Sequence, residues 1–148
     1  MTFTVQFEMA ERIASLPGKK DYGPLSVLVQ TIGHVSWVRT LPPSVFWPRP
    51  QVQSAILRID VDDAKRQNLV ELREAHRFIR DLFVHRRKTL RAGVASIPGL
   101  KRLKGHLDTL FAELELPSDG RAEQLTPEEL HRLFHGVKRL AETVPEST

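Results

Sequence analysis

The segment SVFWPRPQVQSAILRID, residues 44–60, joins an aromatic loop rich in proline to a run of alternating apolar residues. From residue 54 to 61 the alternation predicts a half-buried β-strand, with one face made of Ala55, Leu57, Ile59 and Val61. Before this strand, two large rings, Phe46 and Trp47, stand among Pro42, Pro43, Pro48 and Pro50. Because proline holds the backbone extended and removes a donor, such a loop can present a ring to a ligand at little entropic cost. The alternative is a ring packed beneath the edge of a sheet.

The residues upstream of this segment predict two more strands and two helices. Residues 3–7 and 34–41 read as short strands, while residues 8–15 and 25–32 read as helices. Pro17 and Gly18 are expected to end the first helix. Three strands with two helices make only a small sheet, so residues 1–62 are predicted to form one end of a larger α/β sheet.

The composition becomes helical after Asp62, where we place a domain boundary between residues 1–62 and 63–148. One long helix is expected over residues 68–96 and a second over residues 100–114. The last helix is expected at the sequence TPEE, with Thr126 as cap, Pro127 in the first turn and Glu129 closing a capping box. The predicted fold class is therefore α/β followed by all-α.

The composition excludes several classes of protein. The chain has 148 residues and no cysteine, so no disulfide framework or thiolate chemistry is expected. No apolar run approaches the roughly 20 residues of a membrane span, and residues 1–12 do not resemble a secretion signal. His131 and His135 have the spacing of a helical metal pair, but no third ligand stands out, and no metal is expected. We expect a soluble, cytoplasmic protein without a membrane partner.

The positive charge is concentrated in one part of the chain. Residues 73–104 contain ten Lys or Arg against two acids, a local net charge of +8 in a chain whose total is +4. If residues 68–96 form one helix, six cations share a face: Arg73, Arg77, Arg80, Arg87, Lys88 and Arg91. Three more cations follow: Lys101, Arg102 and Lys104. An unbalanced basic surface of this kind predicts binding to a polyanion such as RNA.

Arg86 differs from these cations because the same helical projection places it among the apolar side chains. An unpaired guanidinium would be costly there. We therefore predict a structural role for Arg86, in which it binds a carboxylate or backbone carbonyls at the junction of the two domains.

Four stretches, in this order, resemble the small-subunit ribosomal RNA adenine dimethyltransferases, also called the dimethyladenosine transferase family: TVQFEMAERIASLPGKKDYGPLSVLVQ, PPSVFWPRPQVQSAILRI, FVHRRKTLRAGV and RAEQLTPEEL. The resemblance implies a Rossmann-like methyltransferase sheet followed by a small helical domain that docks on rRNA. It also implies methylation of two adjacent adenines with S-adenosylmethionine, during ribosome biogenesis.

Within the resemblance, Phe46 occupies the position of the aromatic residue that stacks on the extruded adenine, with Pro48 and Pro50 framing it. A flipped base needs such a ring as a platform. The sequence departs from the family at three nearby positions: Arg49 interrupts the prolines, Gln51 stands in place of Lys and Gln53 in place of Asp.

The sequence also lacks parts that the family uses for catalysis. No G-x-G turn occurs for close approach to the cofactor, and the single asparagine, Asn68, lies in the wrong context for the catalytic motif. We therefore expect the back half of the enzyme, inactive alone, binding no S-adenosylmethionine alone, and prone to self-association through uncovered surfaces. A non-catalytic RNA-binding or ribosome-assembly module is the main alternative. A helix-turn-helix DNA regulator fits the stretch SIPGLKRLKGHL only loosely.

Overall fold

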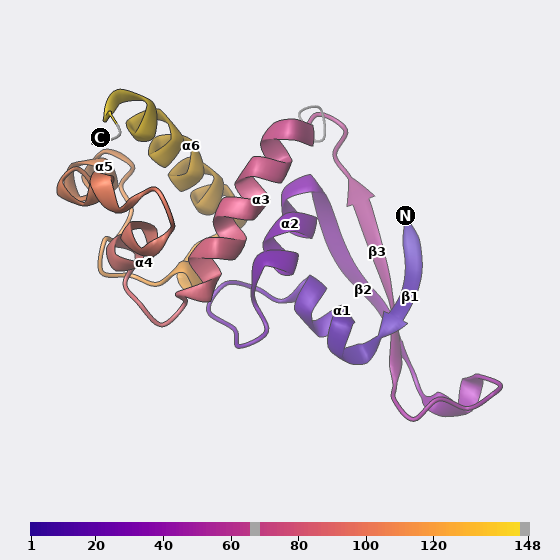
Figure 1. Cartoon of the computed structure of the whole chain (residues 1–148). Helices are drawn as coiled ribbons and strands as arrows, with labels where there is room; N and C mark the ends of the chain where they lie inside the picture. Colours follow the sequence, from indigo (N-terminus) through magenta and orange to yellow (C-terminus); the bar gives the residue numbers. More distant parts are fainter. Residues whose placement is uncertain (66–68, 146–148) are drawn as a thin grey trace. The chain divides into compact units, whose positions relative to one another are not determined.

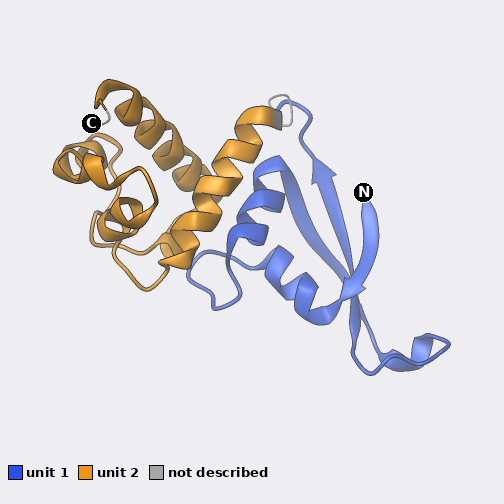
Figure 2. Cartoon of the chain, viewed as in Figure 1, with its two compact units in different colours: residues 1–69 blue, residues 70–148 orange. Residues whose placement is uncertain are grey.

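The structure is a computed structural model in which residues 1–65 and 69–145 are described. The chain divides into two compact units, Met1–Leu69 and Val70–Thr148 (Figure 2). The division follows Leu69 rather than Asp62. Asn68, at which the long helix was expected to begin, lies outside the described residues.

The first unit is built on a three-stranded antiparallel sheet (Figure 1). Its strands are β1 (Thr2–Gln6), β2 (Gly33–Leu41) and β3 (Ser54–Val61), in the order β1-β3-β2. The central strand β3 has the bounds that its alternating residues predict, and it pairs with both neighbours. The structure thus confirms a small α/β unit, while its membership of a larger Rossmann-like sheet stays a prediction.

Two helices pack against one face of this sheet, α1 (Phe7–Ala14) and α2 (Pro24–Ile32) (Figure 1). Ala55 and Leu57 of β3 are fully buried and form a core cluster with Ala10 and Ile13 of α1. Val61 continues the alternation of this face at the end of β3, as the sequence predicts, and its side chain is 37% exposed. Its partner across the sheet is Gly33, which has no side chain to cover it.

Side chains of α2 satisfy the last carbonyls of α1. The Gln30 amide donates to the carbonyls of Ile13 and Ser15 at 3.0 and 2.8 Å. The Ser26 hydroxyl donates to the Arg12 carbonyl and accepts from the Gly23 amide, although Ser26 is completely buried. Because the end of a helix leaves carbonyls without partners, these contacts fix the two helices against each other.

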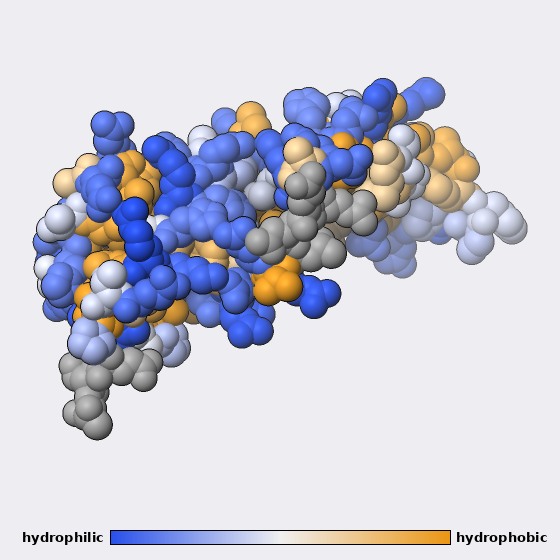
Figure 3. All heavy atoms as spheres, turned by 90° about the horizontal axis from the view of Figure 1, so that it is seen from above, coloured by the Kyte–Doolittle hydropathy of each residue, from blue (hydrophilic) through white to orange (hydrophobic). Residues whose placement is uncertain are grey.

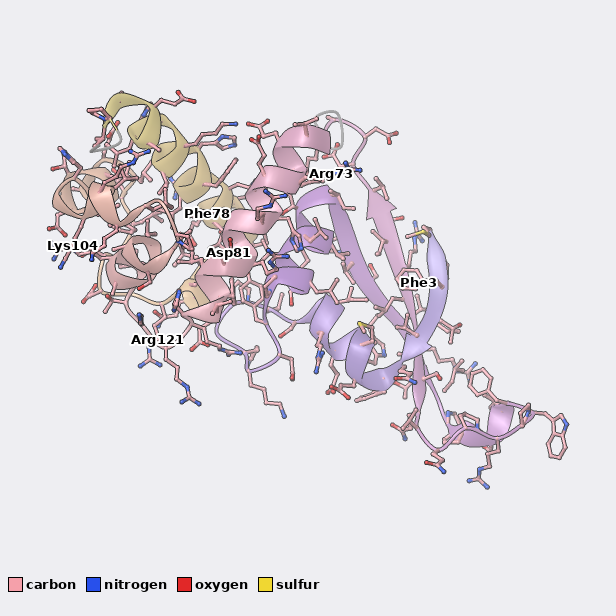
Figure 4. All side chains as sticks on the ribbon, viewed as in Figure 1. Phe3, Arg73, Phe78, Asp81, Lys104 and Arg121 are labelled. Atoms are coloured by element: carbon pink, nitrogen blue, oxygen red, sulfur yellow. The ribbon has the colours of Figure 1, made fainter. Side chains whose placement is uncertain are left out.

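The second unit is helical, with α3 (Leu69–Val84), α4 (Leu90–Ser96), α5 (Leu107–Glu113) and α6 (Pro127–Thr143). Short 3₁₀ helices connect them: η2 (Lys101–Gly105) and η3 (Ala122–Gln124). Phe78 of α3 and Phe134 of α6 are buried, with ring centroids 5.8 Å apart (Phe78 is labelled in Figure 4). Thr126 and Glu129 form the predicted capping box, with bonds of 3.2 and 2.8 Å to each other's amides.

The single helix expected over residues 68–96 is wrong, because α3 ends at Val84 and α4 begins after Thr89. The Thr89 hydroxyl accepts from the Ala92 amide at 3.3 Å, as an N-cap does. The first two amides of α4, those of Leu90 and Arg91, donate to the carbonyls of Gly120 and Ser118 at 2.7 and 3.1 Å. A distant loop therefore stabilises the new helix start, which local periodicity does not reveal.

The helix expected over residues 100–114 is also divided, into η2 and α5. Gly105 lies at the division, and glycine disfavours a continuous α-helix. After α5, the Leu116 and Glu115 amides donate back to the carbonyls of Phe111 and Ala112 at 3.0 and 3.2 Å. Glu115 has a left-handed backbone with φ of 55°, which closes the helix in the manner of a Schellman motif.

Candidate nucleic-acid interface

The loop of residues 42–53 extends beyond the end of the sheet between β2 and β3 (Figure 1). It begins with a 3₁₀ turn, η1 (Pro43–Val45), in which the amides of Val45 and Phe46 donate to the carbonyls of Pro42 and Pro43 at 3.3 Å each. Phe46 is half-buried, whereas Trp47 is 96% exposed. Sequence reasoning gave a role to Phe46 alone, so the more accessible of the two rings was missed.

Two prolines follow the rings of Phe46 and Trp47 in the sequence: Pro48, which is exposed, and Pro50, which is half-buried. Arg49, Gln51 and Gln53, the three departures from the family pattern, are all exposed. The loop contains one cation and no carboxylate. It therefore presents rings, amides and a single positive charge, which suits a ligand carrying both bases and phosphates.

A depression of about 260 Å³ lies at the base of this loop, lined by Gln6, Phe7, Glu8, Val52 and Gln53. The Phe7 amide donates to the Gln53 carbonyl at 3.0 Å, which fixes the returning end of the loop to the start of α1. Phe7 and Val52 are the apolar residues of this depression. Gln6, Glu8 and Gln53 supply amide and carboxylate groups, which can bond the edges of an unstacked base.

In the second unit, three predicted cations form a row along α3: Arg73, Arg77 and Arg80. All three are exposed and follow the i, i+4, i+7 spacing that places residues on one helix face (Arg73 is labelled in Figure 4). Arg80 also lies 3.4 Å from the Asp81 carboxylate, a long ion pair in which the Arg80 side chain remains largely exposed. We call these three residues the α3 row.

A second group of cations lies in the turn before α4, on α4 itself and on η2, which contacts α4, and we call it the α4 cluster: Arg87, Lys88, Arg91, Lys101 and Lys104. Arg91 and Lys104 line a shallow depression of about 200 Å³ together with Thr89. Lys101 and Lys104 are three residues apart in η2, a spacing that places both side chains on one side of a 3₁₀ helix. Hydrophilic side chains predominate on the face of this unit turned to the viewer in Figure 3.

Several members of these groups have partners of their own. Lys88 donates to the Ser96 hydroxyl at 2.9 Å, and Arg91 lies 3.0 Å from Asp108 in an exposed ion pair. Within residues 1–65 and 69–145, no carboxylate forms an ion pair with five exposed cations: Arg73, Arg77, Arg87, Lys101 and Lys104. These five have unneutralised charges available to a polyanion.

The prediction of one continuous basic stripe is wrong. Because the helix ends at Val84, the cations after this residue do not continue the face of α3. Figure 4 shows Arg73 of the α3 row and Lys104, a member of the α4 cluster that was not part of the predicted stripe, at well-separated places on this unit. Two groups of cations replace the single stripe.

Arg102 was predicted to bind RNA, and its position requires a correction. Its guanidinium donates to the Ala141 carbonyl at 3.2 Å and the Val144 carbonyl at 2.5 Å, at the end of α6. A cation at this position satisfies the free carbonyls and the negative end of the helix dipole. Arg102 thus has a structural partner in α6, and we leave it out of the proposed RNA-binding set.

Arg86 has the carboxylate partner that the sequence predicted. Its Nε and Nη2 atoms donate to one Glu123 oxygen at 3.0 and 2.6 Å. The predicted place was wrong in two respects: Arg86 lies in the turn after α3, and Glu123 belongs to the same unit. The ion pair therefore joins the end of α3 to η3 within the helical unit.

Replacing Arg86 by methionine is expected to lower the free energy of unfolding by about 1–2 kcal/mol, since charge-assisted bonds at a partly buried pair are lost. Urea denaturation measures this change. Arg139→Met is the matched control, because its 2.8 Å pair with Glu113 is exposed on both sides and should contribute less than about 0.5 kcal/mol. Equal effects of the two substitutions, or a loss of RNA affinity by Arg86→Met without a loss of stability, would contradict this role.

The two histidines of the last helix do not extend the candidate interface. His135 Nδ1 lies 3.3 Å from Glu71, and burial together with the neighbouring His135 lowers the pKa of His131. In the described part of the chain, no group of three or more His, Asp or Glu residues is arranged to hold a metal ion. Nor does any helix of that part have the length and apolar character needed to cross a membrane.

Similar sequences occur among known proteins. Three curated relatives, each called ribosomal RNA small subunit methyltransferase A, are 38%, 40% and 41% identical over 126, 130 and 128 residues, respectively. They come from Halothermothrix orenii, Myxococcus xanthus and Francisella tularensis subsp. novicida. The matches cover 85%, 86% and 84% of this chain but 42%, 44% and 45% of the relatives. The chain thus spans less than half of their length.

Solved structures show the same fold at low sequence identity. A dimethyladenosine transferase from Plasmodium falciparum matches with a TM-score of 0.81 at 19% identity, covering 94% of this chain and 57% of that protein. The 23S rRNA methyltransferase ErmE matches with a TM-score of 0.59, also at 19% identity, covering 93% of this chain and 54% of that protein. The sequence profile of ribosomal RNA adenine dimethylases matches residues 1–137. The chain therefore belongs to the ribosomal RNA adenine dimethylase family.

Proposed function

We propose that this chain is the substrate-contacting part of an S-adenosylmethionine-dependent rRNA adenine N6,N6-dimethyltransferase that acts on small-subunit rRNA in the cytoplasm during ribosome biogenesis. The family match over residues 1–137 carries the proposal. The names of the curated relatives support small-subunit rRNA as the substrate. In this role, residues 1–62 complete a methyltransferase sheet and residues 63–148 dock on the RNA.

The α3 row and the α4 cluster would contact RNA phosphates. Their exposed cations can displace the counterions that surround RNA, which makes binding dependent on salt. Arg73, Arg77, Arg87, Lys101 and Lys104 are the strongest candidates, because no ion pair with the described residues neutralises them. Arg80, Lys88 and Arg91 would contribute by exchanging exposed partners for phosphates.

Phe46 would form part of the wall that receives the target adenine, with Pro48 and Pro50 holding the backbone extended. The half-buried ring in a proline-framed loop supports this role, since a fixed ring loses little entropy when a base stacks on it. The depression lined by Gln6, Glu8 and Gln53 offers groups that could bond a base edge nearby.

The described residues give no support for a cofactor site in this chain. A cradle for S-adenosylmethionine needs glycines where the backbone approaches a ligand. Here the tight glycines approach their own chain: a Cβ at Gly33 would lie 2.6 Å from the Asp60 carbonyl oxygen, and one at Gly136 would lie 2.9 Å from Leu114. We therefore propose that this chain alone neither binds the cofactor nor transfers a methyl group.

Binding and methyl transfer by the isolated chain test the proposal together. We expect a small-subunit rRNA fragment to bind, a DNA duplex of equal length to bind more weakly, and labelled S-adenosylmethionine to leave the RNA unmethylated. Equal affinity for both nucleic acids would favour general polyanion binding instead of the proposed function. Methyl transfer by this chain alone would contradict the division of roles.

The outer edge of β1 is a candidate surface for self-association. Within the described part of the chain, β1 pairs only with β3, which leaves its other edge without a partner strand. The outer edge of β2 differs, because an irregularity at Val38 interrupts its register between Trp37 and Arg39. Bulges of this kind discourage further strand pairing, whereas a regular edge invites it.

We expect the apparent mass of the chain in light scattering to increase with concentration. Thr4→Lys should suppress this increase, because a charge on the edge strand β1 opposes pairing with a second copy. The same change at Val38 in β2 is the control and should leave association intact. A monomer at every concentration, or equal suppression by both variants, would contradict association through β1.

A further inference from the structure

Trp47 differs from the other tryptophan of the first unit. Trp37 packs edge-to-face on Phe7 with ring centroids 5.4 Å apart, and its indole N–H donates to the Thr40 hydroxyl at 3.2 Å. Trp47 is 96% exposed, and no ring contact or hydrogen bond joins it to any residue in 1–65 or 69–145. Such a large apolar ring gains nothing from folding while it stands in water, so packing does not account for it.

The backbone on both sides of Trp47 is restrained. The 3₁₀ turn Pro43–Val45 precedes it, and Pro48 and Pro50 follow it. Phe46 has an extended backbone with φ of −113° and ψ of 148°. Because successive side chains of an extended chain point to opposite sides, the two rings cannot serve as a platform for the same base.

The charge near Trp47 favours a nucleic acid as its ligand. Arg49, two residues away, is exposed and has no ion pair with the described residues, and residues 42–53 contain no carboxylate. An aromatic ring beside a guanidinium can stack on a base while the cation contacts the adjoining phosphate. The neutral amides of Gln51 and Gln53 in the same loop can bond the edges of bases, which favours RNA over a membrane surface.

We propose that Trp47 stacks on an unpaired base of the RNA that is distinct from the base received by Phe46, while Arg49 contacts a neighbouring phosphate. This inference rests on the proposed RNA-binding function and adds a second base-binding position to it. Trp47 thus acts as a positioning residue, which holds the strand beside the base to be modified.

Fluorescence of the single-tryptophan variant Trp37→Phe tests the stacking directly. A short single-stranded RNA is expected to quench the Trp47 emission, and an abasic oligonucleotide of equal charge is expected not to. Trp47→Ala should weaken RNA binding about 10-fold at every salt concentration, and Trp47→Phe should restore most of the affinity, because stacking needs only an aromatic face. Arg49→Ala should instead make the dependence of log affinity on log salt shallower by about 0.7.

Three outcomes would overturn this inference. If the chain binds RNA and Trp47→Ala binds equally well, no base stacks on Trp47, although the proposed function stands. Quenching by the abasic strand would assign the signal to phosphate binding alone. A shift of the emission caused by anionic lipid vesicles, or by protein concentration without RNA, would identify a membrane or a second copy as the occupant. If the chain binds no RNA at any salt concentration, the proposed function itself fails.

Discussion

Alanine at Arg87, Lys101 and Lys104 together is expected to weaken RNA binding about 100-fold near 0.1 M salt, because each phosphate contact to a single strand contributes about 0.7 to the slope of log affinity against log salt. These residues belong to the α4 cluster, are exposed, and have no ion pair within the described residues. Fluorescence anisotropy of a labelled small-subunit rRNA fragment measures the change. The slope itself should become shallower by about 2.

A variant with the same change in net charge controls for non-specific attraction. Arg12, Arg58 and Arg139 are exposed and paired with Glu8, Asp60 and Glu113, so replacing them by alanine removes three cations that do not belong to the α4 cluster. This variant should bind RNA within about threefold of the unchanged chain, since its cations are already neutralised locally. Equal losses in the two variants would show that overall charge, rather than the α4 cluster, attracts the RNA.

Leu57→Ala is expected to lower the free energy of unfolding of the first unit by about 2–5 kcal/mol, the usual cost of a cavity in a packed core. Leu57 lies in the central strand β3, is completely buried, and belongs to the core cluster with Ala55, Ala10 and Ile13. Urea denaturation followed by Trp37 fluorescence reports on this unit, because Trp37 lies in β2 of the same sheet.

Val61→Ala is the matched control in the same strand. Val61 faces Gly33 at the outer end of β3 and is partly exposed, so its truncation should change the free energy of unfolding by less than about 1 kcal/mol. Similar losses at Leu57 and Val61 would contradict the position of the core, and no cooperative transition in the unchanged chain would show that the first unit needs further strands in order to fold.

Features with a strong local signal were predictable from the sequence. The alternation of residues 54–61 gave β3 its correct bounds, and the TPEE motif located the start of α6. The four motifs also led to the family that the profile match shows. In each case, side chains close in sequence determine the structure through their own periodicity or hydrogen bonds.

Features that depend on distant contacts were not predictable in this way. The apolar residues Leu90 and Val94 continue the helical period of α3, so hydrophobic periodicity does not show the break before α4, and the N-cap Thr89 is its local signal. The carbonyls of Ser118 and Gly120, which accept the first amides of α4, stabilise this helix start from a distant loop. The capping of α6 by Arg102 is equally remote in sequence, and so a cation counted toward the RNA surface proved to have a structural partner.

The candidate site was likewise only partly predictable from the sequence. The sequence located the aromatic loop and the basic segment, because prolines and clustered cations can be recognised in the sequence itself. It did not separate Phe46 from Trp47 by exposure, nor the α3 row from the α4 cluster, because both distinctions depend on the folded chain. The fold thus refines which side chains can reach RNA.

The most direct test of the account is the salt dependence of RNA binding by the unchanged chain. We would measure the affinity for a small-subunit rRNA fragment at several salt concentrations, without S-adenosylmethionine. If most of Arg73, Arg77, Arg87, Lys101 and Lys104 contact phosphates, log affinity should fall with log salt with a slope of about −3. A slope shallower than about −1, or binding that requires the cofactor, would contradict the claim that this chain carries the RNA-contacting surface.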